Sequence, residues 1–114
     1  MTRTDRAIDL NHLDRYTGGD RATNEEILRL FDEQCGQILT KLEGLGTSEA
    51  DAKSWRELTH TLKGAARGIG AFDLGDAVAA AESAGPGRPE ALSRVKRDAG
   101  AVRDFIADFV KTPR

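Results

Sequence analysis

The chain has 114 residues, of which 39% are hydrophobic and 32% charged, and its formal net charge is −2. A chain of this length can bury one core, and the small net charge argues against a nucleic-acid-binding protein, which usually has a strong basic excess. The sequence contains neither a run of about 20 apolar residues that could span a membrane nor a signal peptide. A single cysteine excludes an internal disulfide, so we expect a cytoplasmic protein.

Apolar residues recur at helical spacing along most of the chain, and no segment alternates cleanly as a strand would. Asp9 is a plausible cap of the first helix, and Thr23 with Glu26 fits a capping box at the start of the second. Pro89 suits the first turn of the last helix. The predicted helices cover residues 10–17, 23–45, 50–68, 71–84 and 89–110.

The apolar seam of the last predicted helix steps regularly by three and four residues, which is typical of antiparallel helix bundles. Its members are Leu92, Val95, Ala99, Val102, Ile106 and Phe109. All the linkers are short, which favours neighbouring helices that pack up and down. The sequence therefore predicts an all-α fold, an antiparallel up-and-down four-helix bundle with a short extra N-terminal helix, as one domain over residues 1–114.

His60 lies on the predicted solvent face of the third helix, almost opposite an apolar stripe that begins at Trp55. The same face carries the cations Arg56, Lys63 and Arg67. A small basic island within an acidic chain indicates a local anion site rather than a general polyanion surface.

Gly64 follows His60 by one turn on this face, although a glycine inside a helix costs about 1 kcal/mol relative to alanine. Helical side chains lean toward the N-terminus, so a larger residue at position 64 would cover the histidine. Lys63 could neutralise an anion carried on the imidazole. An exposed imidazole is mostly neutral at cell pH, and its ring nitrogen is a nucleophile. The arrangement suits a histidine that accepts a phosphoryl group.

The chain around this histidine reads His60-Thr61-Leu62-Lys63-Gly64-Ala65-Ala66, followed by Gly70-Ala71 and Leu74. The motif resembles the signature of the histidine-containing phosphotransfer (HPt) domain. Gly18-Gly19-Asp20, the stretch 27–31 and Glu82 also stand where such domains carry similar residues. The chain departs from the pattern at Thr59, where alanine is common, and at Arg67, where a small polar residue is common.

The resemblance implies an intermediate of bacterial multistep phosphorelays, in which His60 accepts a phosphoryl group from an aspartate of one receiver domain and passes it to another. It implies that Lys63 neutralises the phosphate and that Gly64 lets the receiver approach, while Arg56 and Arg67 are further candidates for receiver contact. The implied partners are response-regulator receiver domains, including that of a hybrid histidine kinase. The receiver would supply Mg²⁺, so we expect no metal, cofactor or autokinase activity on this chain.

Two other functions are compatible with a helical bundle. A degenerate relative could bind or sequester receiver domains without transferring phosphate, although His60, Lys63 and Gly64 are retained together. A dimeric histidine-kinase core would require a following ATP-binding domain, so we expect a stand-alone monomer. We expect His12 on the surface and Cys35 as a small buried hydrophobe, with a strip of Leu28, Cys35 and Leu39 as an alternative apolar docking patch.

Overall fold

A computed structural model describes residues 7–111, which form five helices and no strand. The bounds of the helices are Leu10–Thr17 (α1), Arg21–Glu43 (α2), Glu49–Gly68 (α3), Phe72–Ala84 (α4) and Pro89–Lys111 (α5). The all-helical prediction is confirmed. Within the described range no helix is long and apolar enough to cross a membrane.

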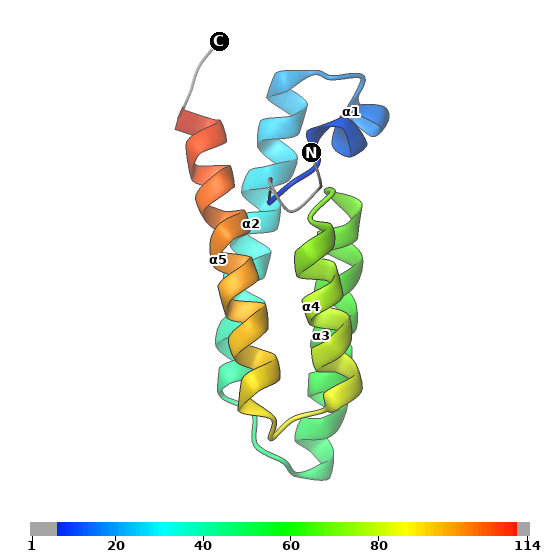
Figure 1. Cartoon of the computed structure of the whole chain (residues 1–114), viewed down its shortest axis with the longest axis vertical. Helices are drawn as coiled ribbons and strands as arrows, with labels where there is room; N and C mark the ends of the chain where they lie inside the picture. Colours follow the sequence, from blue (N-terminus) through cyan, green and yellow to red (C-terminus); the bar gives the residue numbers. More distant parts are fainter. Residues whose placement is uncertain (1–6, 112–114) are drawn as a thin grey trace.

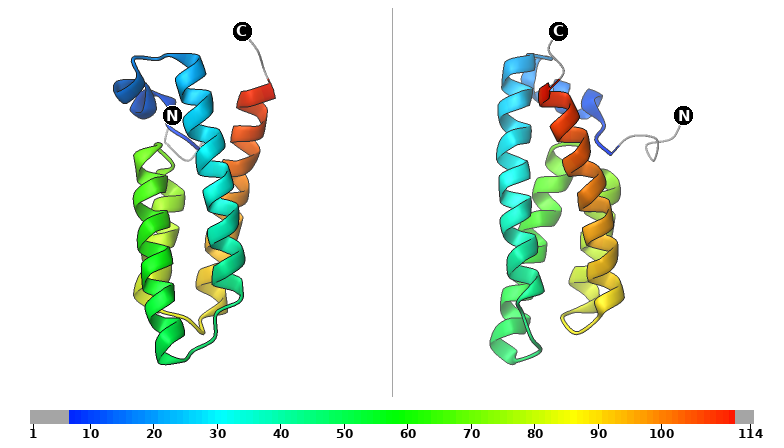
Figure 2. Two further views of the ribbon diagram at one scale, coloured as in Figure 1. Left: turned by 180° about the vertical axis from the view of Figure 1, so that it is seen from behind. Right: turned by 90° about the vertical axis from the view of Figure 1, so that its left-hand side faces the viewer.

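Helices α2 to α5 lie alongside one another and form a ring of contacts (Figures 1 and 2). Each helix packs against the next along the chain, and α5 returns to pack against α2. The chain descends along α2, ascends along α3, descends along α4 and ascends along α5 in the view of Figure 1. Short connections between consecutive helices produce this alternation.

Helix α2 begins two residues earlier than the capping box predicts. Asp20 has extended backbone angles, and its carboxylate accepts a hydrogen bond from the backbone N–H of Thr23 at 2.9 Å. Thr23 therefore lies inside the first turn, and Asp20 is the residue that caps it. The cap of α1 agrees with the sequence, because the Asp9 carboxylate accepts from the N–H groups of Asn11 and His12.

The buried apolar side of α2 is formed by Leu28, Phe31, Cys35, Ile38 and Leu42. Leu28 and Cys35 are fully buried in the core, whereas Gln34 is exposed. The prediction of a docking strip through Leu28 and Cys35 is therefore wrong, and the prediction that Cys35 is a small buried hydrophobe is confirmed. Burial raises the pKa of its thiol to about 11.

The segment before α1 is fastened to the end of α3. The backbone N–H of Asp9 donates to the carbonyl of Gly70 at 2.9 Å, and Ile8 is fully buried. Gly70 has φ +87°, and a Cβ there would lie 2.6 Å from the Asp9 carbonyl oxygen. Only glycine accepts both constraints. The close approach places α1 at the end of the molecule where α2 begins and α3 ends (Figure 2).

Candidate functional site

His60 stands on the outer face of α3, with 75% of its side chain exposed. The residue before it, Thr59, is fully buried, and its hydroxyl donates to the backbone carbonyl of Trp55 at 2.7 Å. The indole Nε1 of Trp55 in turn donates to the Ala81 carbonyl on α4 at 2.8 Å. The indole bond ties α3 to α4, and the burial of Thr59 helps to fix the outward face that His60 occupies.

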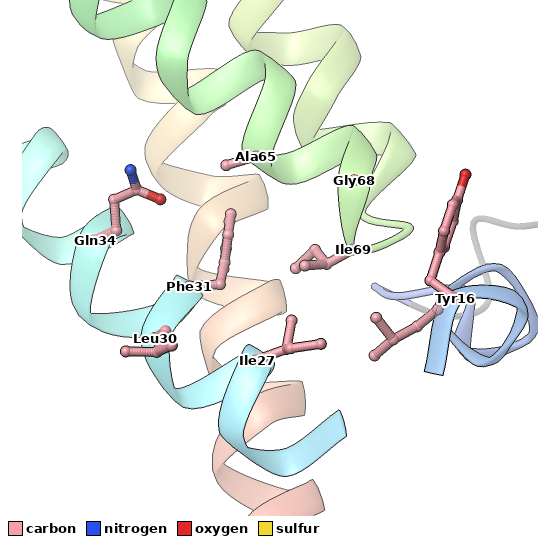
Figure 3. Close-up of a pocket in the computed structure, with 9 residues that line it drawn as sticks. Tyr16, Ile27, Leu30, Phe31, Gln34, Ala65, Gly68 and Ile69 are labelled. Carbon is pink, nitrogen blue, oxygen red and sulfur yellow. The ribbon is translucent and has the colours of Figure 1, made fainter. Parts of the chain in front are cut away.

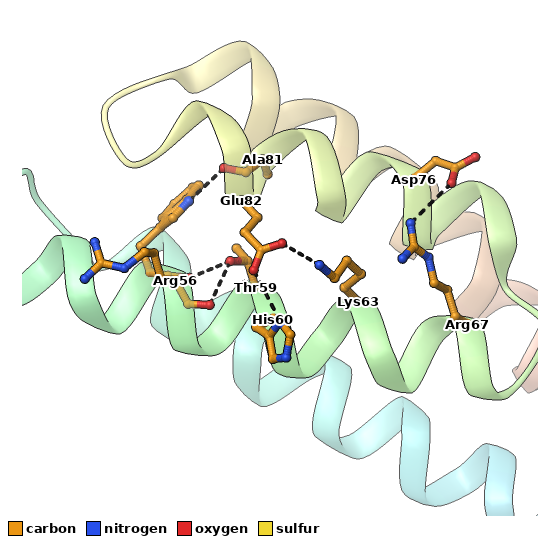
Figure 4. Close-up of polar contacts among 9 residues, drawn as sticks. Arg56, Thr59, His60, Lys63, Arg67, Asp76, Ala81 and Glu82 are labelled. Atoms are coloured by element: carbon orange, nitrogen blue, oxygen red, sulfur yellow. Dashed lines mark hydrogen bonds and ion pairs between the residues drawn. The ribbon is translucent and has the colours of Figure 1, made fainter.

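Glu82 of α4 joins His60 to Lys63. Its Oε2 lies 3.4 Å from Nδ1 of His60, and its Oε1 accepts a hydrogen bond from Nζ of Lys63 at 2.6 Å (Figure 4). The Lys63 ammonium, followed by the His60 ring, lowers the pKa of the Glu82 carboxyl. The carboxylate is therefore ionised at neutral pH and favours a proton on Nδ1. In that tautomer Nε2 carries the free lone pair.

Lys63 is only 22% exposed, because its side chain turns toward α4 rather than straight into solvent. The ammonium and the imidazole thus share one carboxylate on the same edge of the helix pair (Figure 4). A positive charge within reach of the ring is suited to an anion carried by the ring.

Gly64 and Gly68 form an unobstructed ridge on the side of α3 that His60 occupies. The three residues follow one another at four-residue spacing, so they lie on one side of the helix. A Cβ at either glycine would meet no atom within 4 Å. Internal packing therefore does not require a missing side chain at these positions. The bare backbone gives another molecule close access to the histidine.

An apolar groove opens at the end of this ridge, between α1, α2 and α3. Its volume is about 510 Å³, and one wall is formed by Gly68 at the end of α3 and by Ile69, the residue that follows it. Tyr16 of α1 and Leu30 of α2 line it from the other sides (Figure 3). They are 74% and 60% exposed, the exposed large hydrophobic residues of the described chain. Exposed apolar surface gathered in one groove indicates an interaction site.

The two arginines of the predicted site occupy different places. Arg56 is exposed one turn before His60. Arg67 extends over α4, where its Nη2 lies 3.8 Å from Oδ1 of Asp76 (Figure 4). The structure therefore brings Lys63 close to His60 and leaves both arginines at the margins of the face.

The sequence of this chain matches the family model of the Hpt domain over residues 26–108. The chain belongs to the Hpt domain family. Its fold is similar to the crystal structure of the histidine phosphotransferase ShpA from Caulobacter crescentus, with a TM-score of 0.72 and 31% identity. The match covers 92% of this chain and 91% of that chain. No protein of curated function matches the sequence.

Hpt domains interact with the receiver domains of response regulators in phosphorelays. Among residues 7–111, no three histidine, cysteine, aspartate or glutamate side chains lie close enough together to hold a metal ion. His12 lies far along the chain from the site and packs edge-on against the rings of Tyr16 and Phe72.

Sequence reasoning noted Glu82 only as a residue that Hpt domains share and did not place it beside His60. The two residues are 22 positions apart on different helices, so no periodicity within one helix connects them. It also overlooked Leu30 and Tyr16. The exposure of Leu30 is visible only once the buried side of α2 has been located, and that of Tyr16 only once α1 has been placed against the bundle.

Proposed function

We propose that this Hpt domain accepts a phosphoryl group on Nε2 of His60 from the phosphoaspartate of one receiver domain and passes it to the aspartate of another. The observation that carries the proposal is the geometry of the ring. Nδ1 faces the Glu82 carboxylate at 3.4 Å, while the side chain is 75% exposed. The nitrogen that remains available, Nε2, has a lone pair and room for a partner.

The transfer conserves the proton on Nδ1. The Nε2 lone pair attacks phosphorus, the N–P bond forms, and the bond between phosphorus and the aspartyl oxygen breaks. The receiver carboxylate leaves with the electron pair. The imidazole then carries a positive charge, which lies beside the carboxylate of Glu82 and is stabilised by it. Donation to a second receiver reverses these bond changes.

Lys63 supplies the charge for the phosphoryl oxygens in this proposal. Its Nζ is held 2.6 Å from Glu82, next to the ring that would be phosphorylated. A phosphoryl group brings negative charge that competes with Glu82 for the ammonium. Mg²⁺ would be held by the receiver domain, and this chain would act as a carrier without autokinase activity.

The receiver would dock along the ridge of Gly64 and Gly68, with an apolar anchor in the groove beside Leu30 and Tyr16. Buried apolar anchors usually dominate the affinity of an interface. The cations Arg56 and Arg67 would attract an acidic partner at the margins of this surface.

The proposal extends to the form of the whole protein. It takes α2–α5 as an up-and-down four-helix bundle, supported by the ring of contacts between these helices. It takes the protein as a monomer, because the groove and the ridge must both be free for a receiver. It also takes the protein as cytoplasmic. Sedimentation measures the oligomeric state.

The test is incubation with a phosphorylated receiver domain. The wild-type protein should acquire an acid-labile, base-stable phosphoryl group. His60→Gln should lose the label, and His12→Gln, which alters the other histidine of the chain, should keep it. A label that persists in His60→Gln would overturn the assignment. A wild-type protein that binds receivers but never becomes labelled would support the non-transferring alternative.

A further inference from the structure

Gly75 lies buried in the interior of α4, where a glycine costs about 1 kcal/mol relative to alanine. Its backbone angles are not those that require glycine, because its φ is not positive. A Cβ at this position would lie 2.8 Å from Cγ and 3.3 Å from Nε of Arg67. The stem of Arg67 therefore crosses α4 through the space that a side chain at position 75 would fill.

The guanidinium of Arg67 emerges beyond this notch. Its Nη2 lies 3.8 Å from Oδ1 of Asp76, and the two side chains are 47% and 45% exposed (Figure 4). A half-exposed pair at this distance contributes little to stability. The arrangement instead sets a direction, because it leads the side chain away from the outer face of α3 and leaves the cation accessible at the α3–α4 edge.

This direction matters for the face that carries His60. Arg67 lies between the bare ridge of α3 and α4. A long side chain lying over Gly64 or Gly68 would obstruct the ridge. Positions 60 and 67 are two helical turns apart, about 10 Å along the axis, and the guanidinium is held over α4 rather than turned back toward His60. It is too far to reach a phosphoryl group on the ring but stands at the rim of the docking face.

We propose that Gly75 is a positioning residue for Arg67 and that the pair determines which receivers this Hpt domain prefers. The notch presents the guanidinium as a directed cation that selects a receiver with a carboxylate facing the α3–α4 edge. A side chain that is already ordered loses less conformational entropy when it pairs with the partner, and a guanidinium can bind a carboxylate through two parallel hydrogen bonds. The inference rests on the proposed function, because it assumes that a receiver docks on this face.

The first arm of the test examines the notch alone, without a receiver. Gly75→Ala is introduced into the wild type and into Arg67→Ala, and the equilibrium constant of unfolding is measured in urea. In the wild type the added Cβ collides with the arginine stem, so unfolding should become more favourable. In Arg67→Ala the collision is absent and alanine is the better helix former, so the same change should be neutral or make unfolding severalfold less favourable. Equal effects in both backgrounds would overturn the positioning role.

The second arm uses a panel of receiver domains, each phosphorylated with a small-molecule phosphodonor. For the receiver that transfers fastest, Arg67→Glu should raise KM about tenfold with little change in kcat, the size expected of a close charge pair across an interface. Changing one acidic residue at the rim of the receiver pocket to lysine should restore KM. Arg97→Glu, which alters an exposed arginine of α5, is the matched control and should have no such effect.

The two positions should also be coupled in transfer. Gly75→Ala should raise KM in the wild type but not in Arg67→Ala, since there is no arginine left to displace. If the wild type is phosphorylated normally but Arg67→Glu has an unchanged KM, the specificity role alone is overturned. A wild type that no receiver phosphorylates would overturn the proposed function and the specificity role with it, while the unfolding measurements would still decide the geometry of the notch.

Discussion

At the scale of single residues, one carboxylate organises the site. Glu82 contacts Nδ1 of His60 and holds the ammonium of Lys63 at the same time. Its pKa is lowered, first by the hydrogen bond from Lys63 and in smaller part by His60. In the proposed function, the reactive nitrogen would thus be selected by a group on the neighbouring helix rather than by the helix that carries the histidine.

The lowered pKa of Glu82 predicts a pH-dependent effect of Glu82→Gln. A carboxyl whose pKa is depressed in the folded state adds stability above its unfolded pKa, and this contribution is lost as the pH falls through the folded value. The wild type should therefore exceed Glu82→Gln in free energy of unfolding by at most about 1 kcal/mol at pH 7, and the difference should vanish well below about pH 4. Urea unfolding at pH 7 and pH 3 measures it.

The control for this experiment is Glu25→Gln, which removes an exposed pair with Arg29 within one helix and should change stability by no more than about 0.5 kcal/mol. A difference between wild type and Glu82→Gln that is the same at both pH values would contradict the role given to the ionised carboxylate.

Lys63 is predicted to act within the complex with the receiver. Lys63→Ala should lower the transfer rate at saturating receiver about tenfold and shorten the lifetime of the phosphohistidine, with little dependence on salt. Steering charges behave differently, since added salt screens them over a Debye length of about 8 Å. Rapid-quench transfer at two salt concentrations separates the two effects.

Lys96→Ala is the matched control, because Lys96 also pairs across helices, with Glu43 at 3.6 Å, but lies on α5. It should leave transfer unchanged. If Lys63→Ala showed a normal rate at saturation and only a salt-screened binding defect, Lys63 would be a steering charge and nothing more.

At the scale of helices, the glycines on the outer side of α3 lower helix stability and leave His60 accessible to a partner. Gly64→Gln should make the protein as stable as the wild type or more stable by up to about 1 kcal/mol, because glycine is the poorer helix former. Transfer should nevertheless become slower, since the long side chain would overlie His60. The free energy of unfolding and the transfer rate are measured on the same preparation.

Gly100→Gln provides the control on α5. Gly100 is also exposed within a helix, and a Cβ there would also meet no atom within 4 Å. Its replacement should raise stability by a similar amount and leave transfer at the wild-type rate. Equal transfer rates in Gly64→Gln and Gly100→Gln would show that a side chain at position 64 does not limit access to His60.

The helices themselves could be predicted from the sequence because their signals are local. The spacing of apolar residues, the cap signals and Pro89 located all five helices, and the helical wheel of α3 placed His60 on the outside. The start of α2 was missed, because Asp20 and Thr23 are both good caps and the backbone angles decide between them. The contact with Glu82 and the notch at Gly75 could not be predicted, because both depend on how α4 lies against α3.

At the scale of the whole molecule, the packing of the helices divides the apolar residues between the core and the proposed docking surface. Leu28 and Cys35 are buried inside the bundle, whereas Leu30 stays outside and lines the groove with Tyr16. Leu28 and Leu30 are two positions apart, about 200° around the axis of α2, so they face opposite sides of the helix. The surface offered to a partner therefore depends on the packing of all the helices and not on the pattern of one.

The groove predicts an effect of Leu30→Ser on binding. This side chain is 60% exposed, so the change should alter the free energy of unfolding by no more than about 0.5 kcal/mol. The dissociation constant for a receiver should rise about tenfold if Leu30 is an anchor of the interface. Ala107→Ser, at an exposed position of α5, should leave binding unchanged. Unaltered affinity in Leu30→Ser would place the receiver elsewhere.

The most direct test of the central claim is nitrogen NMR of the histidine ring, recorded before and after phosphorylation by a receiver. The free protein should carry the ring proton of His60 on Nδ1, and the phosphorylated protein should show phosphorus bonded to Nε2 of the same ring. In Glu82→Ala the preference for a proton on Nδ1 should weaken. Phosphorus bonded to Nδ1, or to His12, would contradict the account.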